Sequence, residues 1–254
     1  MKNQYRFVFV VVILFYQLLC LAETVKIVAE DDWAPYSAFN AIKSAPEGYA
    51  VDIVREAFKT QNIDVEFVVL PFSRCLHAVK AGEMVGCFDE TMTETNKDLY
   101  YWHPTPLFDE ELSIFGLEET PVKPLGLKDL EGKSVGYTIG YTYPPEFFQN
   151  SNIKKYGINS EKNLIPMLVA GRLDYILLDG LASIYKLNKV PQLKDKLHKV
   201  GTVSKWSYWV VFSKAHPDGK RMVEIFEKGL QALKNSGRYA KMQEQFMQRL
   251  KGSK

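Results

Sequence analysis

Two cysteines and a histidine that lie close together in the sequence offer the most direct chemistry in this chain. Cys75, His77 and Cys87 fall within the stretch PFSRCLHAVKAGEMVGCFDET. A structural zinc site needs four ligands at short spacings, and this stretch supplies only three. A catalytic thiol needs a neighbouring base and a reducing compartment, whereas an oxidising compartment would join the two cysteines in a disulfide. The choice therefore depends on where the protein is located.

The start of the chain has the layout of a secretory signal peptide. Lys2 and Arg6 give it a positive beginning, an apolar run covers residues 7–16, and Ala22 supplies the small residue expected at a cleavage site. A membrane anchor is the alternative, but a spanning helix needs about 20 apolar residues and this run is shorter. We therefore expect residues 1–22 to be a signal peptide and the protein to be periplasmic.

Export favours a disulfide between Cys75 and Cys87, because disulfides form and persist outside the cytoplasm. Two buried free thiols are the main alternative, and a metal site or a catalytic thiol is less favoured. We expect the protein to hold no metal and no cofactor. His77 and His103 receive no role, because one is expected on a solvated helix face and the other is ambiguous.

The charge of the exported chain argues against a nucleic-acid-binding protein. The full sequence has 32 basic and 30 acidic residues, and removal of Lys2 and Arg6 makes the two numbers equal. Domains that bind phosphate backbones usually carry an excess of basic residues. A hydrophobic fraction of 46% is ample for a packed core.

The first half of the exported chain alternates between strand and helix patterns. A buried strand is expected at residues 25–29, an amphipathic helix at 49–59, a strand at 65–70, a short helix that ends at Gly82, and a strand that leads into Asp89. This alternation predicts a parallel sheet with right-handed crossovers.

The pattern recurs in the second half. A strand is expected at residues 134–140, a helix at 161–170 and a second buried strand that ends at Asp179. The segments KAGEMVGCFD and VAGRLDYILLD share one construction: a helix end, Ala-Gly, a strand and a closing aspartate. Two such units suggest two lobes, joined by extended stretches at 110–119 and 206–213 and covered by C-terminal helices. Because ligands bind beyond the carboxyl ends of strands in open α/β sheets, Asp89 and Asp179 should face one cleft.

Six segments in this order resemble a known family. They are DDWAPY, GYAVDIVREAF, PFSRCLHAVKAGE, DLEGKSVGYTIGYTY, LVAGRLDYILLDGLASIY and LKNSGRYAKMQEQF, and they span nearly the whole exported chain. The chain resembles the extracellular solute-binding proteins of bacterial ABC transporters, in particular the polar amino-acid-binding proteins of family 3.

The resemblance implies an α/β protein with the two-lobed type II periplasmic binding fold. Each lobe would be a mainly parallel sheet flanked by helices, with residues 23–112 and 214–254 in the first lobe and 113–213 in the second. It implies a monomeric binding protein without enzymatic activity, which captures a small polar solute, such as an amino acid, for a membrane ABC permease.

The resemblance also assigns site residues. Asp179 matches the aspartate that holds an α-amino group, and the turn at Gly140 and Thr142 matches the α-carboxylate site, which suits the backbone N–H groups of a helix start. The expected ligand-binding residues are Asp31, Trp33, Tyr36, Arg74, Asp89, Asn96, Lys97, Gly140, Thr142 and Asp179. One departure concerns the family's carboxylate-binding arginine, because Asn96 and Lys97 occupy that loop. Lys97 could supply the charge without the bidentate fork and Asn96 could not, and Arg74 could compensate if it points into the cleft.

Several of these residues also have simpler explanations. Asp89 is equally compatible with a turn former or helix cap, Trp33 with a core residue, and Trp206 and Trp209 with lobe or hinge packing. Two alternative functions follow from the same fold. One is a periplasmic dehydratase or lyase that uses Asp89 or Glu90 as acid or base, and the other is a ligand-sensing subunit for a receptor.

Overall fold

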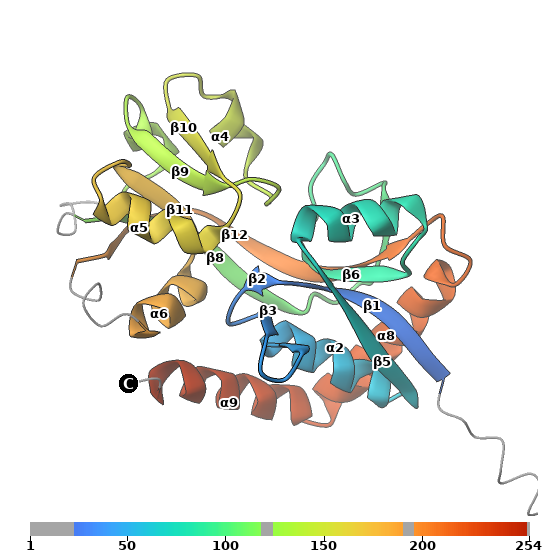
Figure 1. Ribbon diagram of the computed structural model, residues 1–254. Coiled ribbons are helices and arrows are strands. Elements are labelled where there is room, and N and C mark those ends of the chain that lie inside the picture. Colours follow the sequence, from blue (N-terminus) through green and yellow to red (C-terminus); the bar gives the residue numbers. More distant parts are fainter. Residues whose placement is uncertain (1–22, 118–123, 190–195, 253–254) are drawn as a thin grey trace, which may run out of the picture.

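The computed structural model describes residues 23–117, 124–189 and 196–252, and the predicted signal peptide lies outside them. The described chain forms a two-lobed α/β structure built on one curled nine-stranded sheet with a separate three-stranded sheet (Figure 1). The order along the main sheet is β10-β9-β11-β8-β12-β6-β1-β5, and β7 also pairs with β12. The two-lobed α/β fold that the sequence predicts is therefore confirmed.

The first lobe contains the N-terminal strands and the C-terminal helices. Its elements are β1 (Glu23–Glu30), β5 (Ile63–Leu70), β6 (Gly86–Glu90), β7 (Tyr100–Trp102), α2 (Tyr49–Lys59), α3 (Phe72–Ala81), α8 (Gly219–Asn235) and α9 (Arg238–Gly252), with the small sheet β2 (Asp32–Trp33), β3 (Ser37–Asn40) and β4 (Ala45–Glu47). β1 pairs in parallel with both β5 and β6, as predicted. Helix α2 has the predicted bounds because its apolar residues recur at helical spacing and all face the core.

Helices cover both faces of the first-lobe sheet. Helix α3 lies on one face, and α2 and α8 lie on the other with α9 beside them (Figure 1). The predicted apolar face of α8 is buried, from Met222 to Leu233, in the same cluster as the apolar face of α2. The last two helices therefore return to the first lobe, so the chain crosses between the lobes twice.

The second lobe holds the strands β9 (Ser134–Thr138), β10 (Lys154–Ile158) and β11 (Tyr175–Asp179). Its helices are α4 (Pro145–Gln149), α5 (Leu164–Val169) and α6 (Gly180–Lys189), with 3-10 turns η1 (Leu127–Leu130) and η2 (Glu161–Asn163). The sequence pattern does not predict β10, an edge strand with an exposed Lys154, an exposed Tyr156 and no apolar run. The predicted helix at 161–170 is instead η2 followed by α5. Pro166 explains the late start, because proline is tolerated only in the first turn of a helix.

Two long strands connect the lobes. β8 (Phe108–Gly116) pairs with β11 in the second lobe, and β12 (His198–Ser213) pairs with β8 through Tyr208. At Trp209 the partner of β12 changes from β8 to β6 in the first lobe. Both predicted extended stretches are strands within the described residues, and together they form the connection between the lobes.

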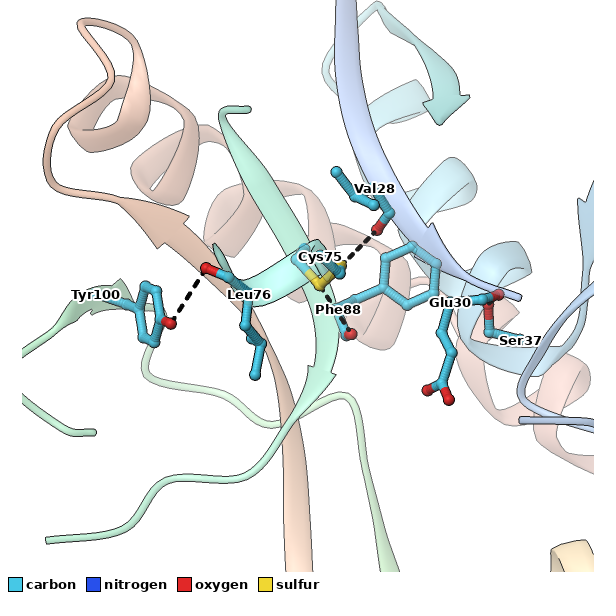
Figure 2. The surroundings of a disulfide bond; sticks show 8 residues. Val28, Glu30, Ser37, Cys75, Leu76, Phe88 and Tyr100 are labelled. Atoms are coloured by element: carbon cyan, nitrogen blue, oxygen red, sulfur yellow. Dashed lines mark hydrogen bonds between the residues drawn. A yellow bond between two sulfur atoms is a disulfide. The ribbon is translucent and has the colours of Figure 1, made fainter. Parts of the chain in front are cut away.

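A disulfide joins Cys75 in α3 to Cys87 in β6, as the sequence predicts, and the two Cα atoms are 6.0 Å apart. Figure 2 shows its surroundings, where the two sulfur atoms lie near the backbone oxygens of Val28 and Phe88. Both cysteines are fully buried and pack against Phe72 and Val79 in an apolar cluster. No group of three or more His, Cys, Asp or Glu suited to hold a metal ion occurs among the described residues.

We expect reduction of this disulfide to destabilise the protein by about 3 kcal/mol, because the bond constrains a short loop in the unfolded chain. Thermal unfolding with and without a reducing agent measures the difference, and a Cys75→Ser/Cys87→Ser variant should unfold like the reduced protein. Thiol titration of the denatured, unreduced chain that begins at Glu23 should find no free sulfhydryl. Two titrating thiols would contradict the pairing.

Candidate functional site

A cavity lies between the two lobes and receives side chains from both. Its walls carry carboxyl groups from Glu30, Asp89, Glu161 and Asp179 and aromatic rings from Trp33, Phe72, Tyr141, Tyr143, Trp206 and Tyr208. Thr91, Thr138 and Thr142 add hydroxyl groups, and Leu112, Leu177 and Leu178 complete the lining. None of the described residues that line the cavity is a lysine, an arginine or a histidine. The site is therefore acidic and aromatic.

Asp179 stands at the carboxyl end of β11, where the sequence predicts it. Its side chain accepts hydrogen bonds from Trp33 Nε1 at 3.0 Å and from the Tyr208 hydroxyl at 3.1 Å. Only 6% of the residue is exposed. Burial, and then the nearby carboxyls of Glu161 and Glu110, raise the pKa of Asp179 to about 8. Both hydrogen-bond donors are neutral, so they orient the carboxylate without neutralising its charge.

Asp89 lies at the corresponding position at the end of β6. The pairing of β6 with β12 skips it, since Trp209 pairs with Glu90 and Val210 with Phe88. Asp89 has a φ of 73°, in the left-handed region that aspartate adopts more readily than most residues. Such a bulge redirects a side chain, and here the Asp89 carboxyl faces the cavity.

The environment of Asp89 does not support the turn-former or helix-cap explanation. Both carboxyl oxygens are buried, and neither has a hydrogen-bond partner among the described residues. Burial, with a further contribution from Asp179, raises the pKa of Asp89 well above its usual range. A buried carboxyl without a hydrogen-bond partner is unfavourable when charged, so burial favours the protonated form of Asp89 in the empty cavity.

Hydrogen bonds between the lobes close the cavity. Thr142 of the second lobe donates to Glu90 Oε1 of the first at 3.0 Å. The Tyr141 hydroxyl donates to the carboxyl of Glu30. Burial raises the pKa of Glu90 to about 7, although its hydrogen bonds act in the opposite direction. Burial also raises the pKa of Glu30 well above its usual range, despite the bond from Tyr141. The structure is therefore a closed state in which second-lobe hydroxyls contact first-lobe carboxyls.

The turn expected to hold a ligand carboxylate has few donors to offer. Gly140 has a φ of 88° and lies against Ser73, which accounts for glycine at this position. Helix α4 begins at Pro145 with Pro144 as its N-cap. Proline has no backbone N–H, so the start of this helix lacks two of the groups that would bind an anion. The Thr142 hydroxyl already donates a hydrogen bond to the Glu90 carboxyl.

Other predicted residues lie away from the cavity. Arg74 is exposed on α3, and Lys97 is exposed and pairs with Glu94 at 2.5 Å. Asn96 donates to Glu90 and to the Thr91 carbonyl, and so orders its loop. None of these three belongs to the cavity lining.

Asp31 and Tyr36 complete the predicted set. Asp31 lines a separate surface groove with Asp32. Tyr36 lies behind the cavity, where it stacks on Trp33 with ring centroids 4.4 Å apart and donates to Glu110 at 2.6 Å. Tyr36 therefore supports the wall of the site from behind.

Several residues that line the cavity are not predicted from the sequence. Glu30 ends the first strand, Glu161 begins η2, and Tyr141 and Tyr208 supply hydroxyls. Trp206, interpreted from the sequence as packing, also lines the cavity, whereas Trp209 stacks edge-on against Trp102. The position of Glu30 at the end of a strand beside Asp31 was the one available signal.

Comparison with known proteins agrees with the fold. The sequence profile of the bacterial extracellular solute-binding proteins, family 3, matches residues 25–249. The ABC transporter arginine-binding protein 1 of Escherichia coli K12 is 23% identical over 84% of this chain and 87% of its own length. No helix among the described residues is long and apolar enough to cross a membrane.

Solved structures show the same fold. ArgBP from T. maritima, as its P235GK mutant, superimposes with a TM-score of 0.76 at 22% identity, covering 89% of this chain and 95% of that protein. A histidine kinase sensor domain with similarity to periplasmic binding proteins superimposes with a TM-score of 0.77 at 20% identity. The match covers 88% of this chain and 95% of that domain. The family consists of binding proteins, which confirms the expectation that this protein is not an enzyme. The chain belongs to the bacterial extracellular solute-binding proteins of family 3.

Proposed function

We propose that this protein captures a small polar solute between its two lobes and presents it to a membrane ABC permease. The observation that carries this proposal is the closed interlobe cavity, where buried carboxyls from both lobes meet. Closure around a solute gives a transporter a shape that differs from that of the empty protein.

The proposal includes the organisation of the chain. Residues 1–22 act as the signal peptide, and the protein works in the periplasm as a monomer. Residues 23–112 and 214–254 form the first lobe and 113–213 the second. The partner change of β12 at Trp209 supports a hinge near that residue. Trp33, Asp89, Thr142 and Asp179 contact the solute, and Tyr36 supports Trp33.

A thermal-shift screen of the protein against amino acids, amines, organic acids and sugars tests this function. A solute present at about 100 times its dissociation constant stabilises the folded state by about 2.7 kcal/mol. For a chain of this size that corresponds to a rise of roughly 5–10 °C in the melting temperature. No shift with any of the four classes would contradict the proposal, as would conversion of the solute into a product.

Tryptophan fluorescence localises the binding. Trp206 lines the cavity, while Trp102 lies outside its lining and stacks against Trp209. We expect a Trp206→Phe variant to lose much of the fluorescence change that the solute causes. A matched Trp102→Phe variant should retain it. A reversed result would place the solute outside the cavity.

A further inference from the structure

The balance of charge in the cavity limits the chemistry of its solute. Four carboxyl groups line the walls, and the described lining contains no cationic side chain. An α-amino acid brings a carboxylate of its own into this space. In a buried site that carboxylate would need a cation or several hydrogen-bond donors to offset the loss of its water, and it would be repelled by every wall carboxyl that is ionised.

The described lining supplies no cation to receive it. Arg74 and Lys97 are exposed and lie outside the lining. The start of α4 is formed by Pro144 and Pro145, which carry no N–H. Of the hydroxyl groups in the lining, that of Thr142 already donates to Glu90, whereas that of Thr138 has no hydrogen-bond partner among the described residues. A ligand carboxylate would therefore gain no positive partner among the described lining residues.

The same walls suit a positive charge. Asp89 is 4% exposed, faces the cavity and has no hydrogen-bond donor among the described residues. The Asp179 carboxylate is held in place by two neutral donors. Trp33, Trp206 and Tyr208 offer ring faces or edges in the same cavity, and aromatic faces attract organic cations.

We propose that the solute is a small organic amine that carries two or more positive charges and no carboxylate, held by Asp89 from the first lobe and Asp179 from the second. This inference rests on the proposed solute-binding function, and it separates the protein from a binder of ordinary amino acids. Glu30 and Glu161 add to the negative potential, and the aromatic side chains pack against the hydrocarbon part of the solute.

Matched pairs of compounds test the inference, because an amino acid and its decarboxylated amine differ only in the carboxylate. Calorimetric titration of the protein at pH 8 would compare arginine with agmatine, lysine with 1,5-diaminopentane, and ornithine with 1,4-diaminobutane. We expect at least one amine to bind, and to bind at least about thirtyfold more tightly than its parent amino acid. Glutamine serves as a neutral, carboxylate-bearing control.

The possible outcomes distinguish the amine inference from the proposed solute-binding function. Tighter binding of an amine supports the inference. Tighter binding of the amino acids overturns it and leaves solute binding intact. If neither class binds and organic acids or sugars do, the inference also fails while the proposed function stands. If nothing in the four classes binds, both fail together.

A substitution at Asp89 adds a test that does not depend on the choice of compound. The change Asp89→Asn keeps the shape of the side chain, and asparagine tolerates the left-handed backbone found there. We expect this variant to bind the preferred amine at least about tenfold more weakly. The matched control is Asp64→Asn, at an exposed carboxyl on β5 outside the lining, and it should bind like the unmodified protein. Equal weakening in both variants, or in neither, would overturn the assignment. Thermal unfolding of the empty variants confirms that both are folded.

Discussion

Replacement of Asp179 by asparagine is expected to weaken binding of the preferred amine by about 2–5 kcal/mol, or roughly thirtyfold to several thousandfold. The carboxyl is buried, and it is the group that Trp33 and Tyr208 hold in position. With asparagine in its place, a positive group would lose its water without gaining a negative partner. Calorimetric titration of the unmodified protein and the variant at pH 8 measures the difference.

The variant should lose affinity without losing its fold. Asparagine has nearly the shape of a protonated aspartic acid, and the Tyr208 hydroxyl can rotate to accept a hydrogen bond from the amide. Because asparagine is neutral without taking up a proton, we expect the empty Asp179→Asn variant to be at least as stable as the unmodified protein at pH 7. Equal affinity of variant and unmodified protein would discard the role of Asp179. A large loss of stability would show that its hydrogen bonds serve the fold more than the solute.

The parts of the site that local pattern controls could be predicted from the sequence. Asp89 and Asp179 each end a buried strand that follows an Ala-Gly helix end, and the carboxyl ends of such strands lie at one edge of a sheet. Both residues line the cavity. The Cys75–Cys87 disulfide followed from the compartment and the short separation, and helix α2 followed from its periodicity.

The parts that depend on contact between lobes could not be predicted. Tyr141 donates to Glu30, which lies 111 residues away, and Tyr208 donates to Asp179 across the connecting strands. Nothing in the local sequence of either tyrosine specifies its partner, because each pairing joins elements that are distant in the chain. Lys97 differs from these residues. Its loop position suggested a ligand contact, but in the structure its side chain extends toward Glu94.

The same carboxyl groups should make the empty protein less stable as the pH rises. The pKa of Asp179 is raised to about 8 and that of Glu90 to about 7, from values near 4 in an unfolded chain. Between these limits the folded protein holds protons that the unfolded chain has released, so the free energy of unfolding falls as pH increases. Each group lowers the free energy of unfolding by at most about 1.4 kcal/mol per pH unit, and this effect ends above the pKa of that group in the folded protein.

Between pH 7 and pH 8 the contribution of Asp179 to stability is separated from the opposing contribution of His103. His103 is buried and its pKa is lowered, so it destabilises the protein only when it becomes charged at lower pH. The groups that act on or bond to Asp179 are Trp33, Tyr36, Asp89, Glu110, Tyr143, Glu161 and Tyr208. The tyrosines among them have pKa values raised above their usual range, so they do not titrate in this interval.

Amine binding should show the reverse dependence on pH. A cation favours the charged carboxylates, so it must displace the protons that the empty site holds below pH 8. Affinity is therefore expected to increase from pH 6 to pH 8, by up to about tenfold per pH unit for each proton released, and then to level off. Titrations in two buffers that differ in ionisation enthalpy count the protons directly. The Asp179→Asn variant should release fewer of them, while an amine affinity independent of pH in the unmodified protein would show that the carboxyls are already charged when the site is empty.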